Sequence, residues 1–174
     1  QEGGGFTVDQ DDRTGAIKVR RAGSGQPVLT HEAQASFRPF LHPITAPDGQ
    51  GVLTEFSPDH HKHQTGIYWG FTRLNGRDYF HHPGGNHWRR KSATVLEPQG
   101  SEVAWQLEYD LLGEDGQPLL TETQRWSLTE ADGSYLLDLV WSGQAHVDVT
   151  IGKYDYGGLF MRMPWSQGIP GAAT

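Results

Sequence analysis

The sequence contains no cysteine, which excludes disulfide bonds, zinc–thiolate sites and cysteine nucleophiles. It also lacks any apolar run approaching the roughly 18 residues that a membrane-spanning helix needs. Positive charge is scarce, because 14 Lys and Arg stand against 21 Asp and Glu and give a formal net charge of −7. A general nucleic-acid-binding surface needs clustered basic residues, and the only basic run is Arg89-Arg90-Lys91. We therefore expect neither a membrane span nor a nucleic-acid partner.

Helical periodicity is missing as well, since no segment repeats its apolar residues every 3.6 positions. Instead, 23 Gly and 10 Pro separate short runs in which apolar and polar residues alternate. Regular short strands between such turns predict an all-β protein, and we expect an antiparallel β-sandwich. The expected strands include 6–10, 16–21, 27–32, 103–111, 119–128, 135–142, 146–151 and 157–163. The residues expected to face the core include Trp105, Leu107, Tyr109, Trp126 and Val140.

The length of 174 residues fits one domain. Residues 1–15 are expected to hold a loose, glycine-rich start and the first strand, and residues 16–174 the sandwich. The run GGLFMRM (157–163) has apolar residues on both faces, which is typical of a strand buried on both sides. Because an exposed edge strand recruits another strand, we expect the sandwich either to continue beyond Thr174 or to be covered by a second copy of the chain.

Six of the nine histidines lie in two neighbouring segments, DHHKHQTGIYWGF (59–71) and YFHHPGGNHWRRK (79–91). Between them, Asn75-Gly76 is a strong signal for a type I′ turn. Such a turn brings the chain back, so that His81 returns towards the level of His60 and His63. We therefore expect these three histidines to share one concave patch. The candidates for the rim of this patch are Arg38 and Arg89.

The residues alone leave three interpretations of these clusters open. Imidazoles two or three positions apart can chelate a divalent metal, and the candidate ligands are His60, His63 and His81, with Zn²⁺, Cu²⁺ or Ca²⁺ as the metal. They can instead hold a polar substrate such as a sugar and exchange protons with it. The third interpretation is a histidine-rich loop that packs on aromatic residues.

Four segments, taken in order, resemble the bacterial PmoA-like family, whose label "methane oxygenase" does not suit a polar β protein. They are FRPFLHPITAPDG (37–49), the first histidine segment, NGRDYFHH (75–82) and GKYDYGGLFMRMPW (152–165). The resemblance runs from about residue 16 to the end. It implies a galactose-mutarotase-like supersandwich, of which this chain is the N-terminal half, and a role in bacterial carbohydrate use. It also implies export to the periplasm or beyond, with which a start at Gln1 is compatible.

The resemblance also points to particular residues. It supports His60, His63 and His81 as catalytic candidates, whereas His61 stands where the family commonly has proline. The family often carries Glu at the position of Tyr156, so a carboxylate base is either absent here or supplied by Asp155. The candidate substrate contacts are Arg38, His42, Gln64, Trp69, Trp88, Arg89, Lys153 and Tyr156. They combine arginine donors, aromatic faces for sugar stacking and a loop before a glycine pair.

Two function classes follow. The first is a carbohydrate-active enzyme, such as an epimerase, lyase or hydrolase, in which a histidine donates a proton to a sugar oxygen and a carboxylate or tyrosine accepts one. The second is a non-catalytic sugar- or metal-binding module. No nucleophilic serine motif, phosphate-binding loop or dinucleotide fingerprint competes with them.

Overall fold

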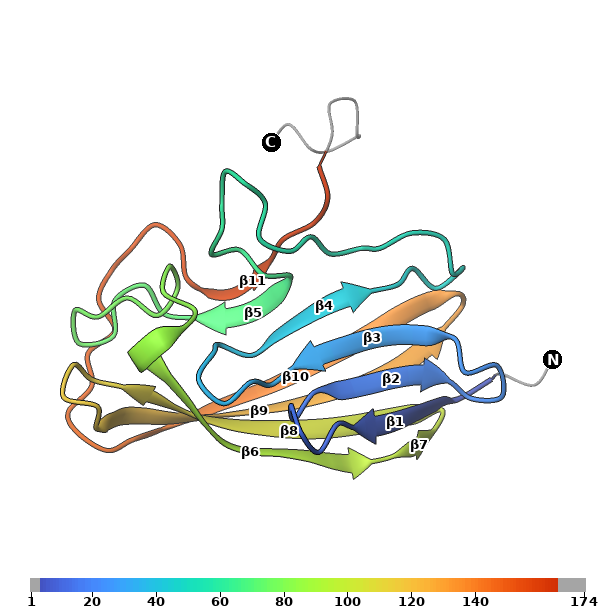
Figure 1. The fold of residues 1–174 in the computed structure, drawn as a ribbon, viewed down its shortest axis with the longest axis horizontal. Helices are drawn as coiled ribbons and strands as arrows, with labels where there is room; N and C mark the ends of the chain where they lie inside the picture. The colour runs from blue at the N-terminus through green and yellow to red at the C-terminus, as the bar shows by residue number, and fades with distance from the viewer. Residues whose placement is uncertain (1–3, 166–174) are drawn as a thin grey trace.

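The computed structural model describes residues 4–165, and these form two stacked antiparallel sheets (Figure 1). The larger sheet has the strand order β11-β5-β4-β3-β2-β1-β7 and the smaller one β10-β9-β8-β6. The larger sheet comprises β1 (Phe6–Gln10), β2 (Ile17–Arg21), β3 (Pro27–Glu32), β4 (Phe40–Ile44), β5 (Ile67–Gly70), β7 (Gln99–Gly100) and β11 (Gly158–Met161). The smaller sheet comprises β6 (Trp88–Glu97), β8 (Glu102–Leu112), β9 (Pro118–Ala131) and β10 (Ser134–Ala145). The predicted all-β sandwich is confirmed.

Helical structure is confined, within residues 4–165, to one 3₁₀ turn, η1 (Gly85–His87). No helix in that part of the chain has the length and apolar character needed to cross a membrane. The first strand pairs with β2 along its whole length, so it is an integral strand of the larger sheet. The glycine-rich start that precedes it lies partly outside the described residues.

The core between the sheets is built around paired tryptophans. Trp105 on β8 lies opposite Trp126 on β9, and both side chains are buried. The Trp105 indole N–H donates a 2.8 Å hydrogen bond to Nδ1 of His31 on the other sheet. A buried indole N–H needs an acceptor, and burial lowers the pKa of His31 to about 3, which keeps its imidazole neutral. This contact links the two sheets through their interior.

The prediction that Val140 faces the core is wrong, because its side chain is 64% exposed. The apolar residues of β10 that pack against the core are instead Tyr135, Leu137, Leu139 and Trp141. This strand carries apolar residues on both faces, including the exposed Leu136. Alternation alone therefore could not decide which face turns inward.

The prediction of a strand over 146–151 is also wrong. This segment is a loop that binds the Asn75-Gly76 turn: Asn75 N–H donates to Thr150 O at 2.9 Å, and Asn75 Nδ2 donates to Asp148 O at 3.0 Å. Asn75 and Gly76 have φ values of 50° and 74°, as a type I′ turn requires. The loop satisfies its backbone groups on this turn, with a single bridge from Ile151 to Leu74.

A second apolar cluster lies on the outer face of the larger sheet. Leu41 and Ile67 point into the core between the sheets, while their neighbours Phe40 and Tyr68 point outward. Phe80, from the loop after β5, completes this buried outer cluster. The loops that connect β4 to β5, follow β5 and precede β11 gather on this side of the molecule (Figure 1).

One flank of the sandwich is open between β10 and β11, which are the outermost strands of their sheets. Two apolar cavities of about 460 and 220 Å³ lie there between the sheets, lined by residues such as Trp69, Leu137 and Met161. Leu159 and Met161 of β11 are 55% and 53% exposed. Within the described residues this flank has no covering strand, in keeping with the expectation for GGLFMRM.

Stability should decrease as the pH falls below about 6.5. The unfolded chain protonates His31 near that pH, whereas the folded chain resists protonation down to about 3. Each pH unit in this window is expected to cost up to about 1.4 kcal/mol. Urea unfolding of the wild type and of His31→Gln at pH 7 and pH 5 measures this, and the variant should show a smaller loss. An equal loss in both proteins would contradict the assignment.

The open flank should make the 174-residue chain self-associate. An edge with exposed apolar residues is an association site, so size-exclusion chromatography with light scattering should give a mass above the 19.3 kDa of one chain. Leu159→Lys should lower this mass without unfolding the protein, because the side chain is already half exposed. A wild-type protein that stays monomeric at high concentration would refute the prediction.

Candidate functional site

A buried arginine joins the two histidine segments. Arg38 lies just before β4 and is fully buried. Its Nη2 donates to the backbone oxygen of His63 at 2.6 Å, and its Nη1 donates to the backbone oxygen of Phe80. Its guanidinium lies 3.3 Å from the centroid of the Tyr68 ring. Burial lowers the pKa of Arg38 to about 10, so it stays charged at neutral pH. Arg38 therefore positions two loops, and the structure does not place it as an exposed sugar contact.

The two histidine segments meet as the turn at Asn75-Gly76 predicted. The rings of His63 and His81 lie 4.6 Å apart between centroids. His61 lies 5.9 Å from His63 and 4.8 Å from His60, so four imidazoles form a row across the loops. Burial, together with His81 and Arg38, lowers the pKa of His63 to about 4. His63 is therefore neutral at physiological pH.

A second arginine, Arg162, holds the far end of this row. It follows β11, and its Nε donates to Glu55 Oε2 at 2.7 Å. Its Nη1 donates to Oε1 of the buried Gln64 at 3.1 Å, and its Nη2 lies 3.1 Å from Nε2 of His60. Gln64 is thus a structural contact of the loop. The sequence reading missed Arg162, although its motif, GLFMRM, was recognised.

The site's most specific feature is a chain of three hydrogen-bonded side chains, Asp78, His81 and Tyr156. Asp78 Oδ2 lies 2.8 Å from Nδ1 of His81, and Nε2 of His81 lies 2.8 Å from the Tyr156 hydroxyl. The other Asp78 oxygen accepts the backbone N–H groups of Phe80 and His81. Burial alone would raise the pKa of Asp78, but these hydrogen bonds outweigh it and lower the pKa.

These contacts fix the direction of the hydrogen bonds. An ionised Asp78 can only accept, so the proton of His81 resides on Nδ1 and Nε2 accepts from the Tyr156 O–H. The neighbour Tyr154 raises the pKa of Tyr156, so the phenol stays protonated. Asp78 was missing from the sequence-based candidates. The sequence signal that could have identified Asp78 was its position three residues before His81, where an aspartate can cap a turn.

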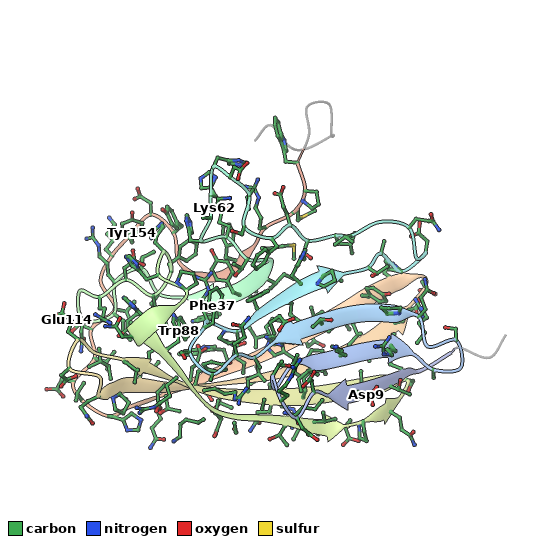
Figure 2. The ribbon with its side chains drawn as sticks, viewed as in Figure 1. Asp9, Phe37, Lys62, Trp88, Glu114 and Tyr154 are labelled. Carbon is green, nitrogen blue, oxygen red and sulfur yellow. The ribbon has the colours of Figure 1, made fainter. Side chains whose placement is uncertain are left out.

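Tyr156 opens onto a depression of about 450 Å³ formed mainly by the loop before β11. The Tyr156 ring is 49% exposed and lies 5.0 Å from the ring of Tyr154, almost perpendicular to it. The depression is lined by Phe71, Thr72, Ile151, Gly152, Lys153, Tyr154, Asp155, Tyr156, Gly157 and Gly158. Figure 2 shows Tyr154 among the loops on the left and Lys62 in a loop at the top, whereas Asp9 lies at the lower right. Asp155 lines the depression but is not part of the hydrogen-bonded chain.

The three candidate metal ligands do not form a metal site here. Both ring nitrogens of His81 are already hydrogen-bonded, to Asp78 and Tyr156, and Nε2 of His60 faces a cationic guanidinium. Across residues 4–165, no group of three or more His, Cys, Asp or Glu side chains has an arrangement suited to a metal ion.

Two further candidates belong to the smaller sheet. Trp88 is buried, and its indole N–H donates to the backbone oxygen of His82 at 3.1 Å. Arg89 pairs with Asp110 at 2.8 Å on the neighbouring strand β8. Trp88 is therefore a core residue, and Arg89 is engaged by a carboxylate.

The last two candidates lie on the larger sheet but outside the hydrogen-bonded chain. Trp69 stacks on Trp141 at 5.0 Å between the sheets, so it faces the open flank and not the histidines. His42 contacts Thr54 Oγ1 through Nδ1 at 2.8 Å and stacks on Phe56. Both are thus engaged in packing.

Replacing Arg38 should destabilise the protein strongly. Arg38→Gln removes a buried cation and leaves the carbonyl groups of His63 and Phe80 without their donor, at a cost of about 3 kcal/mol or more. Lys62→Gln is the control, because its pair with Asp59 is exposed on both sides and should contribute little to the free energy of unfolding. Urea denaturation compares the two, and equal losses would contradict the positioning role.

Comparison with known proteins identifies a family but no activity. No curated protein and no solved structure matches the chain. The model of a family of unknown function, DUF6807, matches residues 18–172, which include both histidine segments, both positioning arginines and the Asp78–His81–Tyr156 chain. The protein therefore belongs to the DUF6807 family.

Proposed function

We propose that the protein binds a carbohydrate in the depression beside Tyr156 and exchanges a proton with it through Asp78, His81 and Tyr156. The observation that carries this proposal is the continuous hydrogen bonding from the partly buried Asp78 carboxylate through His81 to the exposed phenol of Tyr156. Both contacts at His81 measure 2.8 Å. A carboxylate that orients an imidazole, which in turn holds a hydroxyl group, is the arrangement that supports proton transfer at neutral pH.

Each member has a distinct part in this proposal. Tyr156 is the group that reaches the sugar: its oxygen accepts a proton from a sugar hydroxyl while its own O–H proton passes to His81, and the reverse transfer returns the proton. His81 takes up or returns that proton at Nε2, and Asp78 stabilises the imidazolium formed when it does. His63, 4.6 Å away, stays neutral, so it does not oppose that positive charge.

The surroundings favour proton transfer over covalent attack by a carboxylate. Asp78 is turned towards His81 and two backbone N–H groups, so it has no oxygen free to act as a nucleophile. The perpendicular rings of Tyr154 and Tyr156 offer apolar faces of the kind on which sugar rings stack. Glycines at 157 and 158 keep that wall free of side chains.

The biological setting is also part of the proposal. The motifs that resemble the PmoA-like family favour a bacterial, exported protein of carbohydrate use, built on a galactose-mutarotase-like sandwich. A histidine-cluster metal site has less support, because the hydrogen bonds of His81 and the guanidinium beside His60 occupy the nitrogens that a metal would need.

The test separates binding from chemistry. Ligand-observed NMR against a panel of neutral and acidic mono- and oligosaccharides should identify a bound sugar, and the fate of that sugar is then followed by proton NMR. Tyr156→Phe and His81→Gln should retain binding and slow the reaction by about 10²-fold or more, the usual contribution of a positioned acid or base.

His82→Gln is the matched control, because His82 neighbours His81 but stacks on His87, outside the hydrogen-bonded chain. It should leave both binding and rate unchanged. Binding without any reaction would instead indicate a sugar-binding module, and the absence of any bound sugar would reject the proposal.

A further inference from the structure

We infer that the carbohydrate is an acidic sugar, a uronate, and that Lys153 selects it by contacting the carboxylate. This inference rests on the proposed function, because it names the class of substrate for the same depression. The charged side chains around that depression support it, although the whole chain carries a negative net charge.

The first observation concerns a buried cation beneath the site. Arg38 is fully buried, and its donors serve the backbone oxygens of His63, Tyr79 and Phe80 and the hydroxyl of Thr65. Within residues 4–165 no carboxylate forms an ion pair with it, and its Nε atom has no hydrogen-bond partner. Glu122 and Asp78 act on its charge from beyond ion-pair distance, but Asp78 is bonded to His81 and burial raises the pKa of Glu122 to about 7. The charge of Arg38 is therefore only partly balanced, and solvent screens its potential poorly. This potential is positive directly below the His63–His81 pair.

The second observation concerns two cations beside the depression. Lys153 lines it and is exposed, and no ion pair engages this lysine in the described part of the chain. The Arg73 guanidinium lies 5.0 Å from the centroid of the Tyr154 ring, and Arg73 O accepts the Gly152 N–H at 2.8 Å. Arg73 thus fixes the loop that carries Lys153, only three residues before Tyr156.

The third observation concerns the carboxylates that lie near these cations. The described carboxylates at the site are Asp78, which is committed to His81, and Asp155, which lines the depression. Arg162 and Lys62 are paired with Glu55 and Asp59, so they add little. In a chain with a formal net charge of −7, Lys153 is thus an exposed cation without an ion pair in the described part of the chain, and it lines the depression itself. It fits a ligand that carries one carboxylate, while Asp155 remains an acceptor for sugar hydroxyls.

The experiment compares sugars that differ only at carbon 6. Methyl glucuronoside is titrated against methyl glucoside, and methyl galacturonoside against methyl galactoside, by NMR with the full chain. The uronate of a pair should bind at least about tenfold more tightly, as one charge-assisted contact allows. Added salt should weaken the binding of the uronate but not that of the neutral sugar.

Lys153→Gln should remove the preference for the uronate and leave the affinity for the neutral sugar unchanged. Lys91→Gln, on β6, is the matched control and should change neither affinity. Equal binding of both members of a pair, or an unchanged preference in Lys153→Gln, would overturn this inference while leaving the proposed function intact. If no sugar binds at all, both the proposed function and this inference fail.

Discussion

The candidate site depends on one interaction, the contact of the buried Arg38 guanidinium with two loops. Its donors reach the backbone oxygens of His63 and Phe80, which belong to segments before and after β5. Backbone acceptors are set by the path of the chain, so this single side chain fixes where His63 and His81 stand relative to each other. Burying a guanidinium is costly unless its donors are used, and here the hydrogen bonds to these loops offset that cost.

This contact also bears on how the histidines lie so close together. Imidazoles 4.6 Å apart between centroids would repel each other if both were charged, and the cation below them adds to that repulsion. This repulsion is avoided because His63 stays neutral and His81 is hydrogen-bonded to the Asp78 carboxylate. Within this row, His63 is thus a neutral neighbour of His81, the one imidazole that is hydrogen-bonded to a carboxylate.

The sequence predicted the fold better than the site. The Asn75-Gly76 turn predicted that His81 returns towards His63. Alternation located β8 and β9, because core residues such as Trp105 on β8 and Trp126 on β9 belong to runs in which every second side chain is buried. It failed at Val140, where both faces of the strand are apolar. It also failed at Arg38, because a buried positioning arginine and an exposed binding arginine look alike in a sequence. Which of the two is present depends on a tertiary contact.

The chain of Asp78, His81 and Tyr156 could not be assembled from the sequence for the same reason. Asp78 and His81 are three residues apart, but Tyr156 lies 75 residues after His81, in the loop that leads into β11, and β11 pairs with β5. That strand has two roles. Its Phe160 packs into the outer cluster beneath the site, while Leu159 and Met161 line the open flank on the other face. Whatever covers that flank would hold β11 in place, and with it the loop that presents Tyr156. The proposed proton exchange on the outer face and the predicted association at the open flank thus both depend on a single four-residue strand.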